Sequence, residues 1–240
     1  MRLRVLPLFV AGVSLLLVPC GHAALTIITA GEKDLSLAIP DYQSSGLART
    51  VTLSGYESQT PYIVTASIKI DPVGYGAYNG DYFAYLRHIT VDGLQSEVAV
   101  LLNRPGRTAT NTSGYENSGM DVTFADDASV DIHFYQPIAT AGGDLVGNYL
   151  TGNWQPDARN SDPFSVVTSD PRTAFLNPLG GMDPNGQWTL FVADMERGGT
   201  GVLTSWSVKL TPTPEPSSGF LLVSAGTIWL AFRRRRSRSS

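Results

Sequence analysis

Apolar and polar residues alternate with a period of two along much of this chain. In the segment IVTASIKI (residues 63–70) every second position from Val64 onward is apolar, and threonine, serine and lysine stand between them. VLTSWSVKL (202–210) alternates in the same way, so its pattern predicts that Val202, Thr204 and Trp206 share one face. Period-two alternation with β-branched and aromatic residues is typical of half-buried strands.

Six further segments have the same character, and glycine-containing turns separate them. The turns include Asp92-Gly93, Asn185-Gly186 and Gly198-Gly199, and no stretch carries a sustained helical period. Many short strands between such turns predict an all-β fold, a β-sandwich, built as a single domain over residues 24–210. The six predicted strands are Thr50–Leu53, Tyr82–Val91, Glu97–Leu102, Asp121–Phe124, Val130–Phe134 and Trp188–Ala193.

The N-terminal segment has the three parts of a secretory signal. Arg2 and Arg4 precede an apolar stretch from Leu6 to Val18, and Gly21-His22-Ala23 offers small residues for a signal peptidase. We therefore expect residues 1–23 to be a signal peptide that is cleaved after Ala23. Cys20 suggests a lipoprotein as the alternative, but the preceding proline is unfavourable there.

Loss of Cys20, the only cysteine, would leave a mature chain held together without disulfides. The net charge of −4 hides an acidic body, because seven of the 17 basic residues lie in the terminal segments. That leaves ten basic residues against 21 acidic ones, a net charge near −11. Such a surface repels nucleic acid, so we expect no DNA or RNA partner.

The C-terminal segment joins a spacer, an apolar stretch and a basic cluster. Residues 211–218 form a proline-rich linker, and the uncharged stretch 219–232 would span about 21 Å as a helix. A hydrocarbon core is about 30 Å thick, so residues 219–240 predict a short, marginal membrane helix with a basic tail. Arg233, Arg234, Arg235 and Arg236 would stop transfer and remain cytoplasmic.

Pro214, Glu215 and Pro216, followed by that helix and the arginines, resemble the PEP-CTERM sorting signal of exported bacterial proteins. The resemblance implies recognition by an exosortase, a membrane sorting enzyme, and cleavage near this motif after transient anchoring in the inner membrane. It also implies a final location at the cell surface or outside the cell, often with a role in exopolysaccharide or biofilm. A permanent single-span anchor is the alternative.

The body of the chain resembles the P domain (P/Homo B), the jelly roll that follows the catalytic domain of subtilisin-like proprotein convertases. The closest stretch is 185–210, with an Asn-Gly turn and two tryptophan-containing strands. LAIPD (37–41), NGDYFAYL (79–86), VLLNRPG (100–106) and VTFADDAS (122–129) carry the rest of the likeness. The resemblance implies a jelly-roll-like β-sandwich, although Tyr82 stands where leucine is usual and no protease domain accompanies it.

The chain offers little for hydrolysis on its own. It has no Gly-x-Ser-x-Gly motif, and the two histidines of the body, His88 and His133, lie in strand-like patterns. We therefore expect no enzyme activity. Each histidine is interpreted as a solvent-facing or hydrogen-bonded strand residue.

The densest acidic cluster is a candidate calcium site. Asp121, Asp126, Asp127 and Asp131 lie within eleven residues, and calcium prefers six to eight oxygen ligands. The spacing does not match an EF-hand loop, so the alternative is a solvated acidic turn.

Aromatic residues offer a candidate glycan contact. Tyr78, Tyr82 and Trp154 could present rings to a sugar, although Tyr82 and Phe83 must point to opposite faces of their strand. Core packing is the alternative. Together these patterns predict an exported structural or adhesive protein of the surface or matrix, with a protease-accessory domain and a lectin-like module as alternatives.

Overall fold

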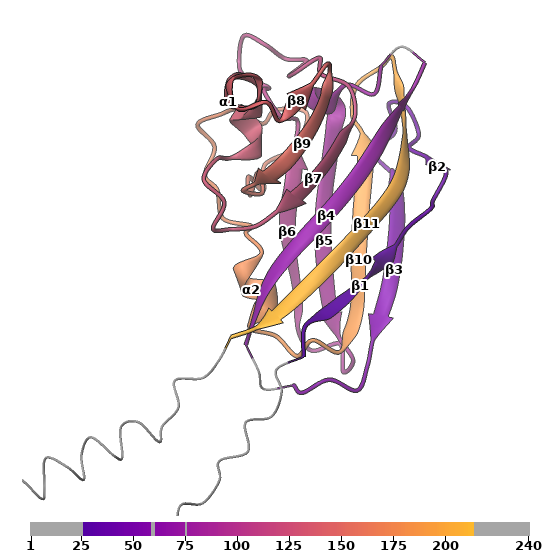
Figure 1. The fold of residues 1–240 in the computed structure, drawn as a ribbon, viewed down its shortest axis with the longest axis vertical. Coiled ribbons are helices and arrows are strands. Elements are labelled where there is room, and N and C mark those ends of the chain that lie inside the picture. The colour runs from indigo at the N-terminus through magenta and orange to yellow at the C-terminus, as the bar shows by residue number, and fades with distance from the viewer. Residues whose placement is uncertain (1–25, 59–60, 75, 214–240) are drawn as a thin grey trace, which may run out of the picture.

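The computed structural model describes residues 26–58, 61–74 and 76–213, which form two β-sheets packed face to face (Figure 1). The predicted all-β, single-domain sandwich is confirmed at this level. The predicted signal peptide, proline-rich sorting motif and C-terminal membrane helix lie outside these residues.

The larger sheet has seven strands in the order β1-β11-β4-β7-β9-β8, with β2 paired to β11. Its pairs are antiparallel except β7 with β9, which run parallel. The strands are β1 (Ile28–Glu32), β2 (Leu37–Ala38), β4 (Tyr62–Val73), β7 (Met120–Phe124), β8 (Leu145–Val146), β9 (Tyr149–Trp154) and β11 (Thr200–Pro212).

The smaller sheet has four antiparallel strands in the order β3-β10-β5-β6 and lies behind the larger one in Figure 1. They are β3 (Leu47–Leu53), β5 (Tyr82–Thr90), β6 (Ser96–Asn103) and β10 (Gly186–Asp194). The helical elements are the 3-10 turns η1 (Asn79–Asp81) and η2 (Ile132–Phe134) and the helices α1 (Tyr135–Gly142) and α2 (Asn177–Gly180).

The alternation read from the sequence places the core between the sheets. Along β4 the residues Val64, Ala66, Ile68 and Ile70 are buried, and the residues that alternate with them are at least partly exposed. Trp188 of β10 and Phe124 of β7 meet them from other strands as fully buried rings. Burial of apolar side chains from both sheets supplies the main stabilisation of a sandwich.

The prediction for β11 is wrong in one detail. A register shift between Leu203 and Ser205 makes Leu203 fully buried, whereas Val202 and Thr204 are only half-buried. The strand resumes its inward alternation at Trp206. A β-bulge adds one residue to a strand and so moves the following side chains to the other face.

The predicted strand Val130–Phe134 and the absence of helix are also wrong. Asp131 accepts a hydrogen bond from the His133 amide (2.9 Å), which begins η2, and the eight-residue helix α1 follows. Gly143 ends that helix in the left-handed conformation (φ 85°). A local side-chain cap therefore overrides the strand-like composition.

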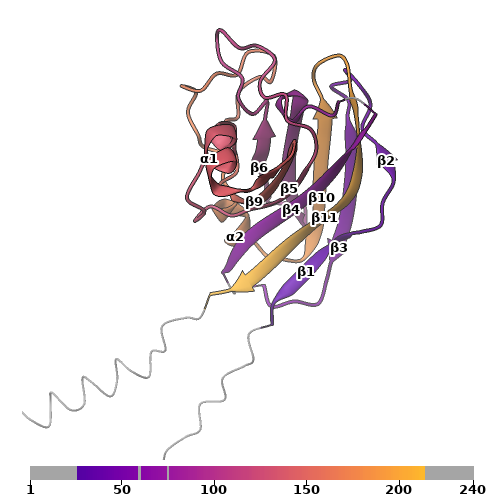
Figure 2. The ribbon, with the colours of Figure 1, turned by 45° about the horizontal axis from the view of Figure 1, so that its top comes forward.

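The described chain enters at Thr26 and leaves at Thr213 at the same end of the sandwich (Figures 1 and 2). Thr213 donates its amide to the Pro61 carbonyl (2.9 Å), which holds this exit against the start of β4. Within residues 26–213, apart from the gaps, no helix has the length and apolar character needed to cross a membrane.

Candidate functional site

Two of the four aspartates proposed for calcium have other partners. The Asp126 carboxylate accepts hydrogen bonds from the amides of Leu176 (3.0 Å) and Asn177 (2.7 Å) at the start of α2. Asp131 caps η2 and pairs with Arg159 Nη1 at 2.9 Å. Both carboxylates therefore stabilise local structure.

The other two, Asp121 and Asp127, are exposed and line different hollows of the larger sheet. Across the described residues, no three His, Cys, Asp or Glu side chains are grouped so as to hold a metal ion. The geometry does not bring the four aspartates together, and calcium binding there stays a prediction without geometric support.

The predicted glycan platform needs correction. Tyr82 is 0% and Trp154 is 2% exposed, and the Trp154 indole donates its hydrogen bond to the Thr151 carbonyl (2.8 Å). Of the three residues only Tyr78 reaches the surface, at 37% exposure. Tyr82 and Trp154 point inward because they belong to the buried set of their strands, so they cannot contact a glycan.

An aromatic group that we did not predict lies on the outer face of the smaller sheet. Tyr85 stacks on Phe191 with ring centroids 4.8 Å apart, and Phe83 meets Phe191 edge-on at 6.3 Å. All three rings are half-buried. The period of two puts Phe83 and Tyr85 on one face, but only the pairing of β5 with β10 brings Phe191 beside them.

His133 belongs to a buried polar network. Its Nδ1 lies 2.8 Å from Asp157 Oδ2 and its Nε2 lies 2.9 Å from the Arg107 carbonyl oxygen. Arg159 Nη1 connects Asp157 (3.0 Å) to Asp131 (2.9 Å). Both ring nitrogens of His133 therefore contact structural partners, and neither contacts a serine hydroxyl.

His88 is likewise buried. Its two ring nitrogens lie near the carbonyl oxygens of Gln187 (3.1 Å) and Asp183 (2.6 Å), and its ring stacks on Trp188 at 4.0 Å. Both histidines are hydrogen-bonded, as one of the two interpretations predicted, and neither faces solvent. His88 lies in β5 as expected, but His133 lies in η2 and not in a strand.

The outer face of the larger sheet carries a row of short polar side chains in register. Ser207 of β11 lies opposite Ser67 of β4, which lies opposite Thr123 of β7, and Thr123 lies opposite Asn153 of β9. The Ser67 and Thr123 hydroxyls are 2.9 Å apart. Two hollows of about 400 and 540 Å³ follow this face and share Thr29, Ser67 and Ser207. We call this continuous surface the hydroxyl trough.

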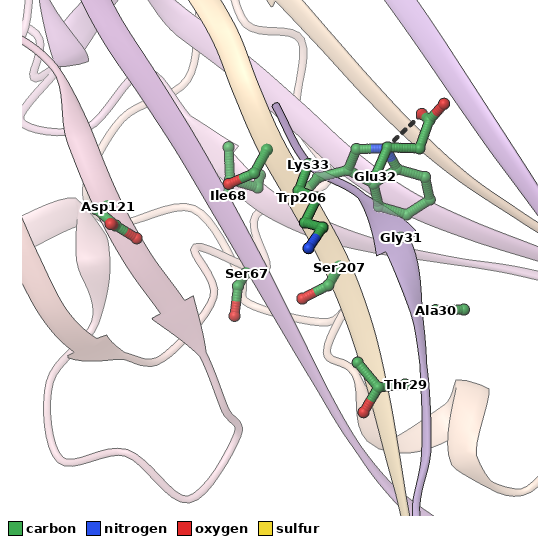
Figure 3. Close-up of a pocket in the computed structure, with 11 residues that line it drawn as sticks. Thr29, Ala30, Gly31, Glu32, Lys33, Ser67, Ile68, Asp121, Trp206 and Ser207 are labelled. Atoms are coloured by element: carbon green, nitrogen blue, oxygen red, sulfur yellow. Dashed lines mark hydrogen bonds between the residues drawn. The ribbon is translucent and has the colours of Figure 1, made fainter. Parts of the chain in front are cut away.

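All three lysines of the chain lie in or beside the hydroxyl trough. Lys33 lines the first hollow, Lys209 lines the second, and Lys69 stands between Ser205 and Asp121 in the neighbouring row. In Figure 3 the Lys33 side chain runs toward Ser207. Three cations of the acidic body therefore lie on this face, together with the carboxylates of Asp121 and Asp127.

The edge of the trough is held by Glu32 at the end of β1. Its carboxylate accepts a hydrogen bond from the Trp206 indole over 2.9 Å (Figure 3). It also accepts one from Arg49 Nε (2.8 Å) of β3, so it connects the two sheets. Hydrogen bonding to Arg49 lowers the pKa of Glu32. The ionised carboxylate therefore keeps Trp206 in place under the trough.

No protein-family model and no curated protein matches the chain. Among solved structures, it is similar to a chain of the complex between the Aeromonas sobria serine protease and its chaperone, at 14% identity with a TM-score of 0.38. That match covers 81% of this chain but only 28% of the other. It is also similar to the VP2 subviral particle of infectious bursal disease virus, at 12% identity and a TM-score of 0.26, over 92% of this chain and 54% of that one. The chain is thus defined by its own architecture as a mostly-β, two-sheet protein.

Proposed function

We propose that this protein is a non-catalytic binding domain that holds an acidic polysaccharide along the hydroxyl trough. The observation that carries the proposal is the register of Ser207, Ser67, Thr123 and Asn153 across four strands, with the lysines beside them. Short hydroxyl and amide groups both donate and accept hydrogen bonds, as sugar hydroxyls do. A long polymer can contact such a row at several points.

The charge of the trough favours an anionic polymer. Lys33, Lys69 and Lys209 can pair with uronate carboxylates, whereas the rest of the acidic body would repel them. Asp121 and Asp127 also border the trough, so their charges limit how closely a carboxylate can approach there. Binding should therefore weaken as salt is added.

The test measures binding of residues 24–213 to polygalacturonate and to neutral dextran by affinity gel electrophoresis. The double change Lys69→Gln and Lys209→Gln should weaken polygalacturonate binding by roughly three- to tenfold, because two exposed ion pairs are lost. Arg87→Gln is the matched control, since Arg87 is an exposed cation on the smaller sheet.

Equal effects of the lysine and Arg87 changes, or no retardation by polygalacturonate, would exclude the trough as the binding surface. Retardation by dextran that disappears in Tyr85→Ala would instead assign binding of neutral glycans to the aromatic group on the other sheet.

We further propose that the fold is a jelly roll of the P-domain kind. Without the two-residue strands β2 and β8, and without β9, which extends the larger sheet beyond β7, eight strands remain along the chain: β1, β3, β4, β5, β6, β7, β10 and β11. One sheet then contains the first, eighth, third and sixth of them, and the other contains the second, seventh, fourth and fifth. This order supports a jelly roll, which consists of two interleaved Greek keys.

Export and sorting through Pro214-Glu215-Pro216 complete the proposal. Mass spectrometry of the C-terminal peptide of the native protein tests them. Cleavage near this motif is expected in cells with an exosortase. Persistence of the full chain to Ser240 as the main form in such cells would contradict sorting, while leaving the test of the trough unaffected.

A further inference from the structure

A second polar site, separate from the hydroxyl trough, lies where three loops meet. It is a pocket of about 220 Å³ between η1, the loop that follows β6 and the loop between β10 and β11. We call it the acidic pocket. Its lining residues are Tyr78, Asp81, Ser113, Tyr115, Glu116, Glu196 and Arg197.

Backbone hydrogen bonds join the three loops. The Gly80 amide donates to the Tyr115 carbonyl (2.9 Å), and the Met195 amide donates to the Asp81 carbonyl (2.8 Å). The Tyr115 amide in turn donates to the Pro105 carbonyl (2.9 Å). These bonds hold the pocket walls in place without a ligand, so a ligand would meet a preformed site.

Asp81 is the unusual member of this pocket. It is 3% exposed, and its carboxylate accepts no hydrogen bond from the part of the chain that the structure describes. Asp194, which is 1% exposed, lies close enough to act on its charge, although Asp194 itself accepts the Glu196 amide (3.2 Å). A buried carboxylate without a partner is costly, and a bound cation would remove that cost.

The charges around Asp81 add to a negative site. Asp194, Glu196 and Asp41 act on it with like charge, and Arg104 opposes them. The Arg104 guanidinium is already engaged by the carbonyls of Gly80 and Thr112 and by Glu196. The positive charge of Arg104 is therefore shared with these partners and does not fully neutralise Asp81.

The remaining charged residues of the lining do not supply the missing cation. Glu116 is exposed and adds negative charge at the mouth of the pocket. The Arg197 guanidinium lies 4.7 Å above the ring of Tyr42, which is outside the lining. A positive group from another molecule is thus the complement that the pocket lacks.

Two tyrosines make an organic cation the best fit. Tyr78 and Tyr115 line the pocket beside Asp81, and aromatic rings attract ammonium and guanidinium groups. The pocket has room for the end of one long side chain. We propose that the acidic pocket binds a lysine or arginine side chain of a protein partner, with Asp81 as its counter-ion.

This inference does not rest on polysaccharide binding. Its test is a titration of residues 24–213 with N-acetyl-arginine methylamide and N-acetyl-lysine methylamide, in which the backbone amide NMR chemical shifts report binding. We expect millimolar binding with shifts at Asp81, Tyr115 and Glu196, and none with the neutral norleucine analogue. Asp81→Asn should weaken binding at least tenfold, whereas Asp127→Asn, which removes an exposed carboxylate elsewhere, should not.

Binding should also strengthen as pH rises from 5.5 to 8. Burial, followed by the charge of Asp194, raises the pKa of Asp81 to about 7, and burial raises that of Asp194 to about 6. The charged groups that act on Asp81 are Asp194, Glu196, Asp41 and Arg104, and a bound cation would favour the ionised form of Asp81 and of the other three carboxyl groups.

If Asp81→Asn fails to fold, Glu116→Gln serves instead, and a smaller but measurable loss of affinity is expected. Three results would overturn the proposal: equal shifts with the norleucine analogue, binding of calcium but not of the basic ligands, or tighter binding of glucosamine than of either amino acid. The last would assign the pocket to an amino sugar.

Discussion

Arg104 Nη2 donates a hydrogen bond to Glu196 Oε2 over 3.1 Å, and this contact joins the loop after β6 to the loop between β10 and β11. The Arg104 side chain is 2% exposed and its backbone is left-handed (φ 53°). The same guanidinium donates to the carbonyls of Gly80 (2.6 Å) and Thr112 (3.1 Å). One buried cation therefore organises all three walls of the acidic pocket.

Replacement of Arg104 by methionine should destabilise the protein. The change leaves the Gly80 and Thr112 carbonyls without their donor, while Glu196 is exposed enough to be hydrated again. We expect the free energy of unfolding to fall by about 2–4 kcal/mol in urea titrations. Arg87→Met, at an exposed arginine, should change it by less than about 0.5 kcal/mol.

Stability should decrease as pH rises toward neutrality. The pKa of Asp81 is raised from 3.8 to about 7, so the folded state keeps a proton that the unfolded state has lost. Its stabilisation is complete below pH 3.8 and disappears as pH rises through 7. With allowance for solvent screening at the pocket mouth, the loss is about 1–3 kcal/mol, measured by urea unfolding at several pH values.

Asp81→Asn is the matched variant for this pH dependence, because asparagine is neutral throughout. In this variant the free energy of unfolding should fall less steeply between pH 5 and 8. The fall that remains is due to Asp194, whose pKa is raised to about 6. An unchanged slope in Asp81→Asn would show that other groups cause the pH dependence.

Tyr82→Phe should stabilise the protein or leave it unchanged. The Tyr82 hydroxyl is buried and has no hydrogen-bond partner among the described residues. A Cβ atom added to Gly201 of β11 would lie only 2.2 Å from this hydroxyl oxygen, so the two sheets approach each other closely there. Removal of an unpaired buried hydroxyl is expected to raise the free energy of unfolding by up to about 1 kcal/mol, as measured by thermal melting. A loss above that size would mean that the hydroxyl has a partner, such as a buried water.

Replacement of Asp126 and of Asp127 by alanine should change the free energy of unfolding by different amounts, although the two residues are neighbours in the chain. Asp126→Ala removes the acceptor for the Leu176 and Asn177 amides and should cost about 1–2 kcal/mol. Asp127→Ala removes an exposed carboxylate and should leave the free energy of unfolding nearly unchanged. Melting temperatures with and without millimolar calcium complete the comparison. A calcium-dependent rise that both changes abolish would restore the predicted calcium site.

Most of the strands follow from local pattern. β4 extends the predicted segment 63–70 by one residue at its start and three at its end, and β5, β6, β7 and β10 differ from their predicted bounds by no more than two residues. β9 was missed because YLTGNW contains no clean alternation, and β1 because Gly31 interrupts it. These strands form because neighbouring strands offer them hydrogen-bonding edges.

The sites were less predictable. The sequence offered Asp126 and Asp131 as candidate ligands, but the Leu176 amide bonded to Asp126 lies 50 residues away along the chain. Arg159, which pairs with Asp131, lies 28 residues away. The sequence did not predict the role of Asp81, because no local pattern indicates that its carboxylate is buried near Asp194. The three lysines also gave no signal, because they are widely separated in sequence.

The sequence by itself determined the all-β class, the inward and outward faces of the long strands and the acidic character of the body. Those properties depend on side-chain polarity at a period of two and on composition, which are local. Only the tertiary structure decided that Ser207, Ser67, Thr123 and Asn153 form one row, and that Asp81 is buried in a pocket with other carboxylates nearby. Strand pairing and loop packing join residues far apart in the chain, and the burial that they produce sets the charge, the partners and the accessibility of each side chain.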